Sequence, residues 1–161
     1  MRLSIITVTL NSKKTIISTL NSILSQTYKD IEHIIVDGGS TDGTVQIINE
    51  YNHHNKKLII SKGSGIYKSM NLGIENASGE IITILNSDDI YQNENSISNV
   101  MKCVSKFPNK SIFLGDVVYF KNTSFYNIYR HYKAKHFKTW QLKIGLMPPH
   151  PPSFIKKKIY N

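Results

Sequence analysis

The sequence contains very little cysteine, because Cys103 is the only one in 161 residues. A single thiol allows neither a disulfide framework nor a metal site built from several cysteines, which suits a reducing compartment such as the cytoplasm. Cys103 lies in a run of apolar residues with helical spacing, so we expect it on the buried face of a helix. The sequence thus offers a core thiol and no thiol chemistry.

Long hydrophobic runs are also absent. No apolar stretch reaches the ~18 residues of a membrane-spanning helix, and the start MRLSIITVTLNS is too short and too polar for a signal peptide. With 40% hydrophobic and 19% charged residues, the composition is that of a globular domain. We therefore expect a single cytoplasmic domain that is not integral to a membrane.

Acidic residues are missing from the last quarter of the chain. All 11 Asp and Glu residues precede position 117, so residues 117–161 account for the whole net charge of +9. Aromatic side chains are interleaved with the basic ones, as in Tyr129-Arg130 and Tyr132-Lys133. This mixture fits an anionic membrane surface, a phosphate-bearing acceptor, or RNA. It equally fits a half-buried segment whose acidic partners lie outside this sequence, and since no RNA-binding motif occurs we expect no nucleic-acid partner.

Two glycine-rich phosphate-binding patterns are absent as well. No G-x-G-x-x-G follows the first apolar segment, and no G-x-x-x-x-G-K-[ST] occurs anywhere. A dinucleotide-binding fold or a P-loop would therefore lack its phosphate cradle. A divalent cation held by carboxylates is the simplest remaining way to meet phosphate charge.

The sequence does contain an alternation of apolar and amphipathic segments. Strands are predicted at residues 2–9, 31–37, 57–61, 80–85 and 111–115. Helices are predicted at residues 16–24, 44–51, 66–77 and 97–104, and the last residues before 161 resemble the start of another helix. Continuously apolar strands that alternate with helices predict an α/β fold, with a mostly parallel sheet and helices on both faces.

Polar residues and glycines follow four of these strands. They are Thr9 and Asn11, then Asp37, Gly38 and Gly39, then Gly63 and Gly65, then Asp88 and Asp89. Because ligands bind outside the carboxyl ends of parallel strands, we expect these residues to converge on one site. The adjacent Asp88 and Asp89 repel each other and suit a visiting cation, although capping of the following helix is an alternative. For Asp37, the alternative is capping of the turn GGSTDG.

Five segments resemble family 2 glycosyltransferases in order and spacing, especially the bacterial branch that builds O-antigen and exopolysaccharide. They are SIITVTLNS, SILSQTYKDIEHIIVDGGSTDGT, GIYKSMNLGI, ASGEIITILNSDD and FLGDV. The resemblance implies the Rossmann-like nucleotide-diphospho-sugar transferase (GT-A) fold, a nucleotide-diphospho-sugar donor and a Mg²⁺ or Mn²⁺ ion. It also implies transfer with inversion to a saccharide or lipid-linked acceptor, in surface polysaccharide biosynthesis. Residues 1–116 would be the donor-binding region of a single domain, and residues 117–161 the incomplete start of the acceptor region.

The resemblance also implies roles for individual residues. The segment NSDD matches the D-x-D segment of the family, with Asn86 in the first acidic place, so Asp88 and Asp89 are the predicted metal ligands. The predicted nucleotide-sugar-binding residues are Thr9, Asn11, Asp37, Gly38, Gly65, Asn71 and Asp88. For Asn71, an exposed helical position without a binding role is the alternative.

Three features depart from the family pattern. Gly63 and Lys68 stand where relatives usually carry Asp, which removes one carboxylate near the nucleotide and inverts another charge. No carboxylate follows Asp116, whereas the general base of the family lies further along the chain, so this sequence resembles a C-terminally shortened enzyme. Asp116 and His150 are the remaining candidates for the base. The alternative is a non-catalytic nucleotide-sugar-binding or assembly module, and a shortened sheet would expose apolar surface that favours self-association.

Overall fold

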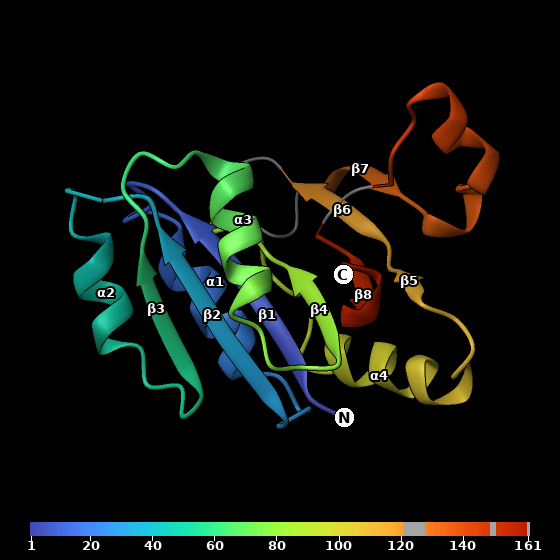
Figure 1. Ribbon diagram of the computed structural model, residues 1–161, viewed down its shortest axis with the longest axis horizontal. Helices are drawn as coiled ribbons and strands as arrows, with labels where there is room; N and C mark the ends of the chain where they lie inside the picture. The colour runs from blue at the N-terminus through green and yellow to red at the C-terminus, as the bar shows by residue number, and fades with distance from the viewer. Residues whose placement is uncertain (121–127, 149–150, 161) are drawn as a thin grey trace.

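A six-stranded sheet forms the centre of the molecule in a computed structural model, which describes residues 1–120, 128–148 and 151–160 (Figure 1). Its strands are β1 (Leu3–Thr9), β2 (Ile31–Asp37), β3 (Lys56–Ile60), β4 (Ile81–Ile84), β5 (Ile112–Leu114) and β8 (Ser153–Lys156). The strand order is β3-β2-β1-β4-β8-β5. β1 pairs in parallel with β2 and β4, and β2 pairs in parallel with β3, whereas β8 is antiparallel to both of its neighbours. The prediction of a mostly parallel sheet is confirmed.

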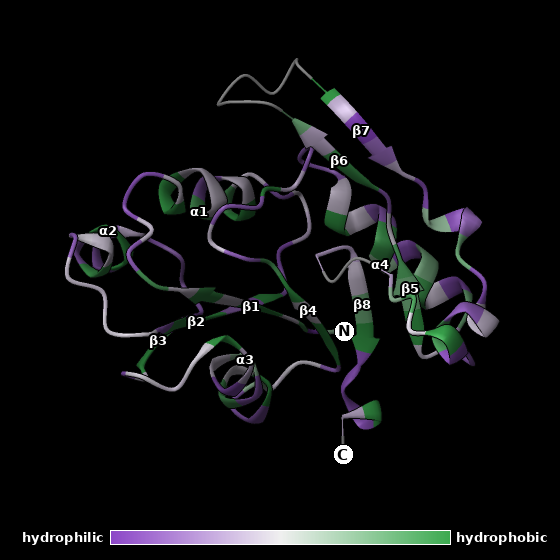
Figure 2. Cartoon of the chain, turned by 90° about the horizontal axis from the view of Figure 1, so that it is seen from above, coloured by the Kyte–Doolittle hydropathy of each residue, from purple (hydrophilic) through white to green (hydrophobic). Residues whose placement is uncertain are grey.

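Helices cover both faces of this sheet (Figure 2). α1 (Ile16–Leu24), α2 (Thr44–Glu50) and α4 (Ser96–Lys106) lie on one face, and α3 (Ile66–Glu75) lies on the other. The side chains of β1 alternate accordingly: Leu3 and Ile5 pack with residues of α1 and α4, whereas Ile6 and Val8 pack on the side of α3. Because β1 is buried on both faces, it had to be apolar throughout.

The contact between α3 and β1 depends on a small residue. A Cβ atom at Gly73 would lie 2.5 Å from Cγ2 of Ile6, so the glycine lets the helix backbone approach the strand. The buried positions of α3 are Ser69 and Gly73. Ile66, the first residue of the helix, is 53% exposed, because the close approach uses the small side chains of the helix.

The end of the chain differs from the prediction. In place of the start of a helix, Ser153–Lys156 forms β8, followed by a single 3-10 turn, η3 (Lys157–Ile159). Phe154 of β8 is buried among core residues, and β8 fills the position between β4 and β5. Phe154 packs against core residues that are remote from it in the sequence, and this burial fixes residues 153–156 as a strand.

The exposure of Cys103 and a second, smaller sheet are the remaining features of the fold. Cys103 is exposed, so its predicted place in the core is wrong: the core side of α4 is set by Met101 and Val104, and position 103 points away from both. β6 (Val117–Phe120) and β7 (Ile128–Tyr132) form a separate antiparallel two-stranded sheet, and the 3-10 segments η1 (Ala134–His136) and η2 (Thr139–Ile144) follow β7. No helix in the described ranges is long and apolar enough to cross a bilayer.

Candidate functional site

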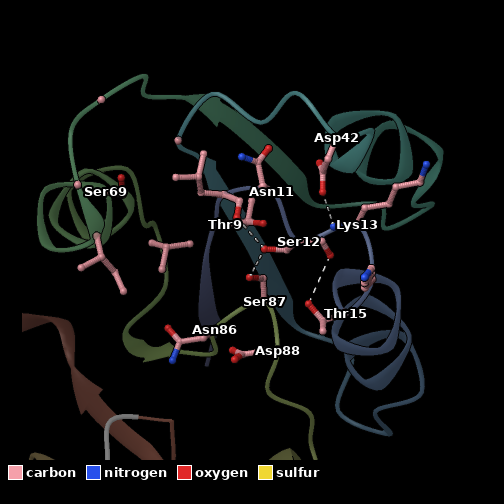
Figure 3. Close-up of a pocket in the computed structure, with 17 residues that line it drawn as sticks. Thr9, Asn11, Ser12, Lys13, Thr15, Asp42, Ser69, Asn86, Ser87 and Asp88 are labelled. Carbon is pink, nitrogen blue, oxygen red and sulfur yellow. Dashed lines mark hydrogen bonds between the residues drawn. The ribbon is translucent and has the colours of Figure 1, made fainter. Parts of the chain in front are cut away.

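A cavity of about 870 Å³ opens where β1, β2 and β4 end (Figure 3). Its walls come from the loop after β1, the turn after β2, the segment that leads into α3 and the loop after β4. Five of the predicted site residues line it: Thr9, Asn11, Gly38, Gly65 and Asp88. The sheet therefore brings together residues that are up to 79 positions apart, from Thr9 to Asp88, at the edge where ligands of parallel sheets bind.

Two polar atoms at this cavity have no protein partner. The Oγ1 atom of Thr9 and the Oδ1 atom of Asn86 are buried and accept or donate no hydrogen bond within the described residues. Thr9 as a whole is only 6% exposed. Buried polar atoms are almost always satisfied, because leaving one unpaired costs about 1–3 kcal/mol. Such atoms at a cavity wall therefore point to a ligand that supplies the missing contacts.

The two adjacent carboxylates have different surroundings. Asp88 lines the cavity, whereas Asp89 is half-buried, is not among the lining residues and accepts a 3.1 Å hydrogen bond from Nδ2 of Asn86. Burial raises the pKa of Asp89, and the charge of Asp88 raises it further. The helix-cap alternative is wrong, because the N-cap of α4 is Asn95. The negative charge of the pair is therefore not used to cap that helix.

Asp37 is fully buried and holds the turn that follows β2. Its Oδ1 accepts the N–H groups of Gly39 and Ser40 at 2.8 Å each, and its Oδ2 accepts the hydroxyl of Ser40 at 2.5 Å. It does not line the cavity. The turn-capping role, which the sequence left open, is thus present, and direct contact of Asp37 with a nucleotide stays a prediction.

Asn11 connects this turn to the loop after β1. Its backbone has a φ of 50°, in the left-handed region that asparagine tolerates better than most residues. Its N–H donates to Oγ of Ser40 at 2.8 Å, and its Oδ1 accepts the N–H of Thr41 at 2.9 Å. Asn11 therefore fixes the geometry of two cavity walls at once.

A chain of hydroxyl contacts links three walls, and the sequence reasoning missed it. The Oγ atoms of Ser12 and Ser87 lie 2.8 Å apart, which joins the loop after β1 to the loop after β4. The N–H of Ser12 donates to Oγ1 of Thr44, which donates to Oδ1 of Asp42. This hydroxyl lowers the pKa of Asp42, helped by the N–H of Lys13. Serine and threonine are so common in loops that no sequence signal singled these residues out.

Two lysines also line the cavity without having been predicted. Lys13 and Lys14 lie just before α1, and both are exposed at the cavity wall. Gly63, one of the departures from the family pattern, lines the cavity too, whereas Lys68 is exposed outside it. The cavity thus contains positive charge from the β1 side and negative charge from Asp88 on the β4 side.

The remaining candidates lie elsewhere. Asn71 is exposed on α3 and does not line the cavity, which matches the alternative that the sequence left open. Asp116 is exposed after β5, where its Oδ1 accepts the N–H of Ala134 at 2.9 Å and its Oδ2 lies 3.3 Å from Nε2 of His131. His150 lies outside the described residues. Within the described ranges, no group of three side chains forms a complete metal site.

Comparison with known proteins places these observations in a family. The model of the family described as Glycosyl transferase family 2 matches residues 4–159. The PGL/p-HBAD biosynthesis glycosyltransferase of Mycobacterium bovis is 34% identical over 125 residues, covering 76% of this chain and 48% of that protein. Glycosyltransferase GlyG of Streptococcus pneumoniae is 35% identical over 108 residues, covering 65% of this chain and 35% of that protein. The chain spans about half the length, or less, of these relatives.

Solved structures agree on the fold. S. aureus TarS 1-349 in complex with UDP-GlcNAc superposes with a TM-score of 0.77 at 24% identity, over 99% of this chain and 46% of that chain. The mannosyltransferase PcManGT from Pyrobaculum calidifontis, in complex with GDP-Man and Mn²⁺, gives a TM-score of 0.65 at 25% identity, over 78% of this chain and 37% of that chain. The Rossmann-like GT-A fold that the motifs implied is confirmed.

Proposed function

This chain belongs to glycosyl transferase family 2, and we propose that its cavity binds a nucleotide-diphospho-sugar for transfer to a saccharide or lipid-linked acceptor. The observation that carries the proposal is the pair of buried, unpartnered oxygens, Thr9 Oγ1 and Asn86 Oδ1, beside Asp88 at the carboxyl edge of the sheet. A sugar nucleotide has hydroxyl and phosphate groups that can satisfy both atoms. Solved relatives were obtained with UDP-GlcNAc and GDP-Man, which supports this ligand class.

The walls of the cavity suit the parts of such a donor. Gly38 and Gly65 present backbone without side chains, so that a flat ring can approach them closely. Lys13 and Lys14 add positive charge for a diphosphate. In the proposed complex, Thr9 and the loop of Asn11 orient the nucleoside, and Asp37 acts through the turn that it holds.

The residues around Asp88 fit a divalent cation. Asp88 offers a carboxylate at the cavity, and Oδ1 of Asn86 lacks a protein partner among the described residues. Asp89 is the second predicted carboxylate, and its pKa is raised by burial and then by the charge of Asp88. Mg²⁺ and Mn²⁺ prefer oxygen ligands and are commonly held by one or two carboxylates together with phosphate oxygens. When bound there, such an ion would neutralise charge on the departing nucleoside diphosphate. The solved PcManGT contains Mn²⁺, which supports the choice of metal.

The catalytic base is left unassigned. Inverting transfer, which we include in the proposal, needs a group that takes the proton of the acceptor hydroxyl. Asp116 is the last carboxylate of the sequence, and both of its oxygens are engaged, by Ala134 and His131. Asp116 and His150 remain the two candidates within this sequence.

A second candidate function is nucleotide-sugar binding without transfer. The observation that favours it concerns the carboxylates that line the described cavity, Asp42 and Asp88. Asp42 accepts hydrogen bonds from Lys13 and Thr44, and Asp88 is proposed to hold the metal, so neither is free to act as a base. A non-catalytic or assembly module would need no such base.

We also propose a biosynthetic process and a cellular location for the reaction. The resemblance to enzymes of O-antigen and exopolysaccharide synthesis supports a role in surface polysaccharide biosynthesis. The relative from Mycobacterium bovis is described as a PGL/p-HBAD biosynthesis glycosyltransferase, which is a different product name. We place the reaction at the cytoplasmic face of the membrane, where a lipid-linked acceptor would be available.

Calorimetric titration with UDP and GDP, each with and without Mn²⁺, tests the binding site. We expect Mn²⁺-dependent binding of one nucleotide that weakens at least ~10-fold in Asp88→Asn, since a lost metal carboxylate removes both charge and a ligand. Glu75→Gln, on the exposed side of α3 and outside the cavity, is the matched control and should bind normally. Unchanged affinity in Asp88→Asn would refute the metal assignment, and absence of binding by either nucleotide would refute the donor site.

Transfer is tested separately from binding. A panel of sugar nucleotides incubated with the protein, Mn²⁺ and candidate acceptors distinguishes the two functions. Release of nucleoside diphosphate coupled to acceptor glycosylation supports the enzyme. Tight donor binding with no turnover on any acceptor supports the binding module.

A further inference from the structure

A lobe outside the cavity carries an unusual concentration of exposed apolar side chains. We call residues 133–148 the apolar lobe; it contains η1 and η2 and follows β7. Five of its large apolar side chains are between 46% and 64% exposed: Trp140, Leu142, Ile144, Leu146 and Met147. They fall within eight consecutive positions, from 140 to 147. Exposed large apolar side chains concentrated in this way point to a site of interaction.

The charges of the apolar lobe are all of one sign. Lys133, Lys135, Lys138 and Lys143 are exposed in it, and the sequence contains no Asp or Glu after position 116. Asp116, which precedes the lobe, accepts the N–H of Ala134. The lysines of the lobe therefore have no acidic side chain among their neighbours in sequence, and they attract an anionic partner.

The apolar lobe lies at one end of the molecule. Figures 1 and 2 show it at the end of the molecule opposite to α2 and β3, connected to the body through β7. The segment turns sharply at Gly145, whose φ of 77° closes η2. Lys133, Lys135 and Lys138 precede the exposed apolar side chains in the sequence, and Lys143 lies between Leu142 and Ile144.

We propose that the apolar lobe docks on an anionic lipid surface, with Trp140, Ile144 and Met147 in the headgroup region and the lysines against lipid phosphates. Tryptophan favours the membrane interface, and basic residues add electrostatic attraction to anionic lipids. The cores of protein–protein interfaces are depleted in lysine, which disfavours a protein partner. A second copy of the chain would bring the same positive charge and be repelled.

Docking would hold the cavity near a lipid-linked acceptor, so this inference deepens the proposed function. The benefit of docking rests on that function, whereas the docking itself does not. The docking surface and the donor cavity share no residue. Lipid binding and donor binding can therefore fail independently, and each is measured by its own experiment.

The sequence supplies its own probe, because Trp140 is the only tryptophan of the chain. The full 161-residue protein is mixed with vesicles of phosphatidylcholine alone, or of phosphatidylcholine with phosphatidylglycerol, and tryptophan emission and co-sedimentation are recorded. We expect a blue shift and sedimentation with the anionic vesicles only. Both should be reversed by high salt, since exposed charges are screened over ~3 Å at 1 M.

Matched variants separate the apolar lobe from the general surface. Ile144→Ser with Met147→Ser should lower the vesicle partition constant at least ~10-fold, because each loses an interfacial apolar side chain. Ile17→Ser with Leu24→Ser, at exposed apolar positions of α1 outside the cavity, should leave it unchanged. Lys138→Ser with Lys143→Ser should abolish the preference for anionic lipid, whereas Lys102→Ser with Lys110→Ser should not.

Each of four results would count against the inference. Equal binding to neutral and anionic vesicles would show that electrostatic attraction does not drive the docking. The absence of a blue shift with both kinds of vesicle would show that Trp140 does not enter the headgroup region. A blue shift that grows with protein concentration in the absence of lipid would show that the lobe packs against a second copy. Loss of vesicle binding with intact nucleotide affinity would refute the docking alone, and the reverse result would refute the donor site alone.

Discussion

At the scale of single residues, the site depends on hydroxyl groups as much as on carboxylates. The Asp88 carboxylate is the group that most resembles a metal ligand, yet Asn86 and Asp88 flank Ser87, which is anchored to Ser12 across the cavity floor. Ser87 is 9% exposed, so its hydroxyl is committed to this contact. The position of the acidic loop therefore depends on a contact between two serines, one from the loop after β1 and one from the loop after β4.

Replacing Ser87 by Ala should weaken metal-dependent nucleotide binding without unfolding the protein. Loss of one buried hydrogen bond costs about 1 kcal/mol, which corresponds to about a fivefold change in affinity if the loop loses its orientation. Calorimetric titration measures the change. Ser105→Ala is the control, since its hydroxyl donates to the carbonyl of Met101 within α4 and should leave affinity unaltered. Equal affinities for Ser87→Ala and the native chain would show that the serine pair does not orient the loop.

At the scale of elements, α3 packs close to β1 because its core side has small residues. Its core side uses Ser69 and Gly73 in place of large apolar residues, and the residues with apolar side chains lie beside this seam. Because the helix sits close to β1, its start at Ile66 reaches the cavity wall. The small residues of the helix thus contribute to the shape of the site.

Substitution of Gly73 by Ala tests this packing. The new Cβ would meet Cγ2 of Ile6 at 2.5 Å, and relieving such a clash typically costs about 1–3 kcal/mol, more than the ~1 kcal/mol that alanine gains in helix propensity. We expect a lower free energy of unfolding in urea titrations. Lys68→Ala, on the exposed side of the same helix, should change it by less than about 0.5 kcal/mol. Stabilisation by Gly73→Ala would show that the helix can move away from the strand freely.

At the scale of the whole molecule, the sheet joins the two ends of the chain. β1 lies at its centre, and β8, formed by residues 153–156, separates β4 from β5. Strand β8 thus belongs to the region predicted as the start of the acceptor part, yet it completes the sheet of the donor part. The free energy of unfolding therefore depends on contacts between β8 and the strands of the donor part. The expected self-association of the chain stays a prediction.

Acid should destabilise the molecule through His33, which is fully buried between Thr7 and Tyr51. Burial, followed by the charges of His53 and Lys56, lowers its pKa to about 3. Above the unfolded pKa of about 6.5, both states hold a neutral imidazole and stability is full. As pH falls from about 6.5 towards 3, the unfolded state binds a proton that the native state does not, so stability falls by up to ~1.4 kcal/mol per pH unit.

Urea unfolding between pH 7.5 and pH 4 measures this loss. His33→Gln, which keeps a polar side chain but does not titrate, should show a flatter dependence on pH even if it is less stable overall. His136→Gln in the exposed η1 is the control and should keep the native slope. A slope in His33→Gln equal to that of the native chain would assign the acid sensitivity to other groups.

The sequence by itself determined the main elements and the identity of the family. Residues 31–37 were predicted as a strand with the bounds that the structure has, because a run of apolar residues between two turns leaves a buried parallel strand as the consistent choice. The residues that follow these strands were placed at one edge by the rule for parallel sheets, and Thr9, Asn11 and Asp88 do meet there. These inferences needed only local periodicity and chain direction.

The tertiary structure decided what depends on partners remote in sequence. Ser153–Lys156 becomes a strand because β4 and β5 offer it hydrogen bonds and Phe154 a place in the core, none of which is encoded locally. Cys103 is exposed because the core side of α4 is chosen by its neighbours Met101 and Val104. The unpartnered oxygen of Asn86 and the contact of Ser12 with Ser87 exist only once loops from different strands are side by side. Periodicity tells which side chains share a face, but hydrogen bonds between loops depend on distances that only the packed sheet sets.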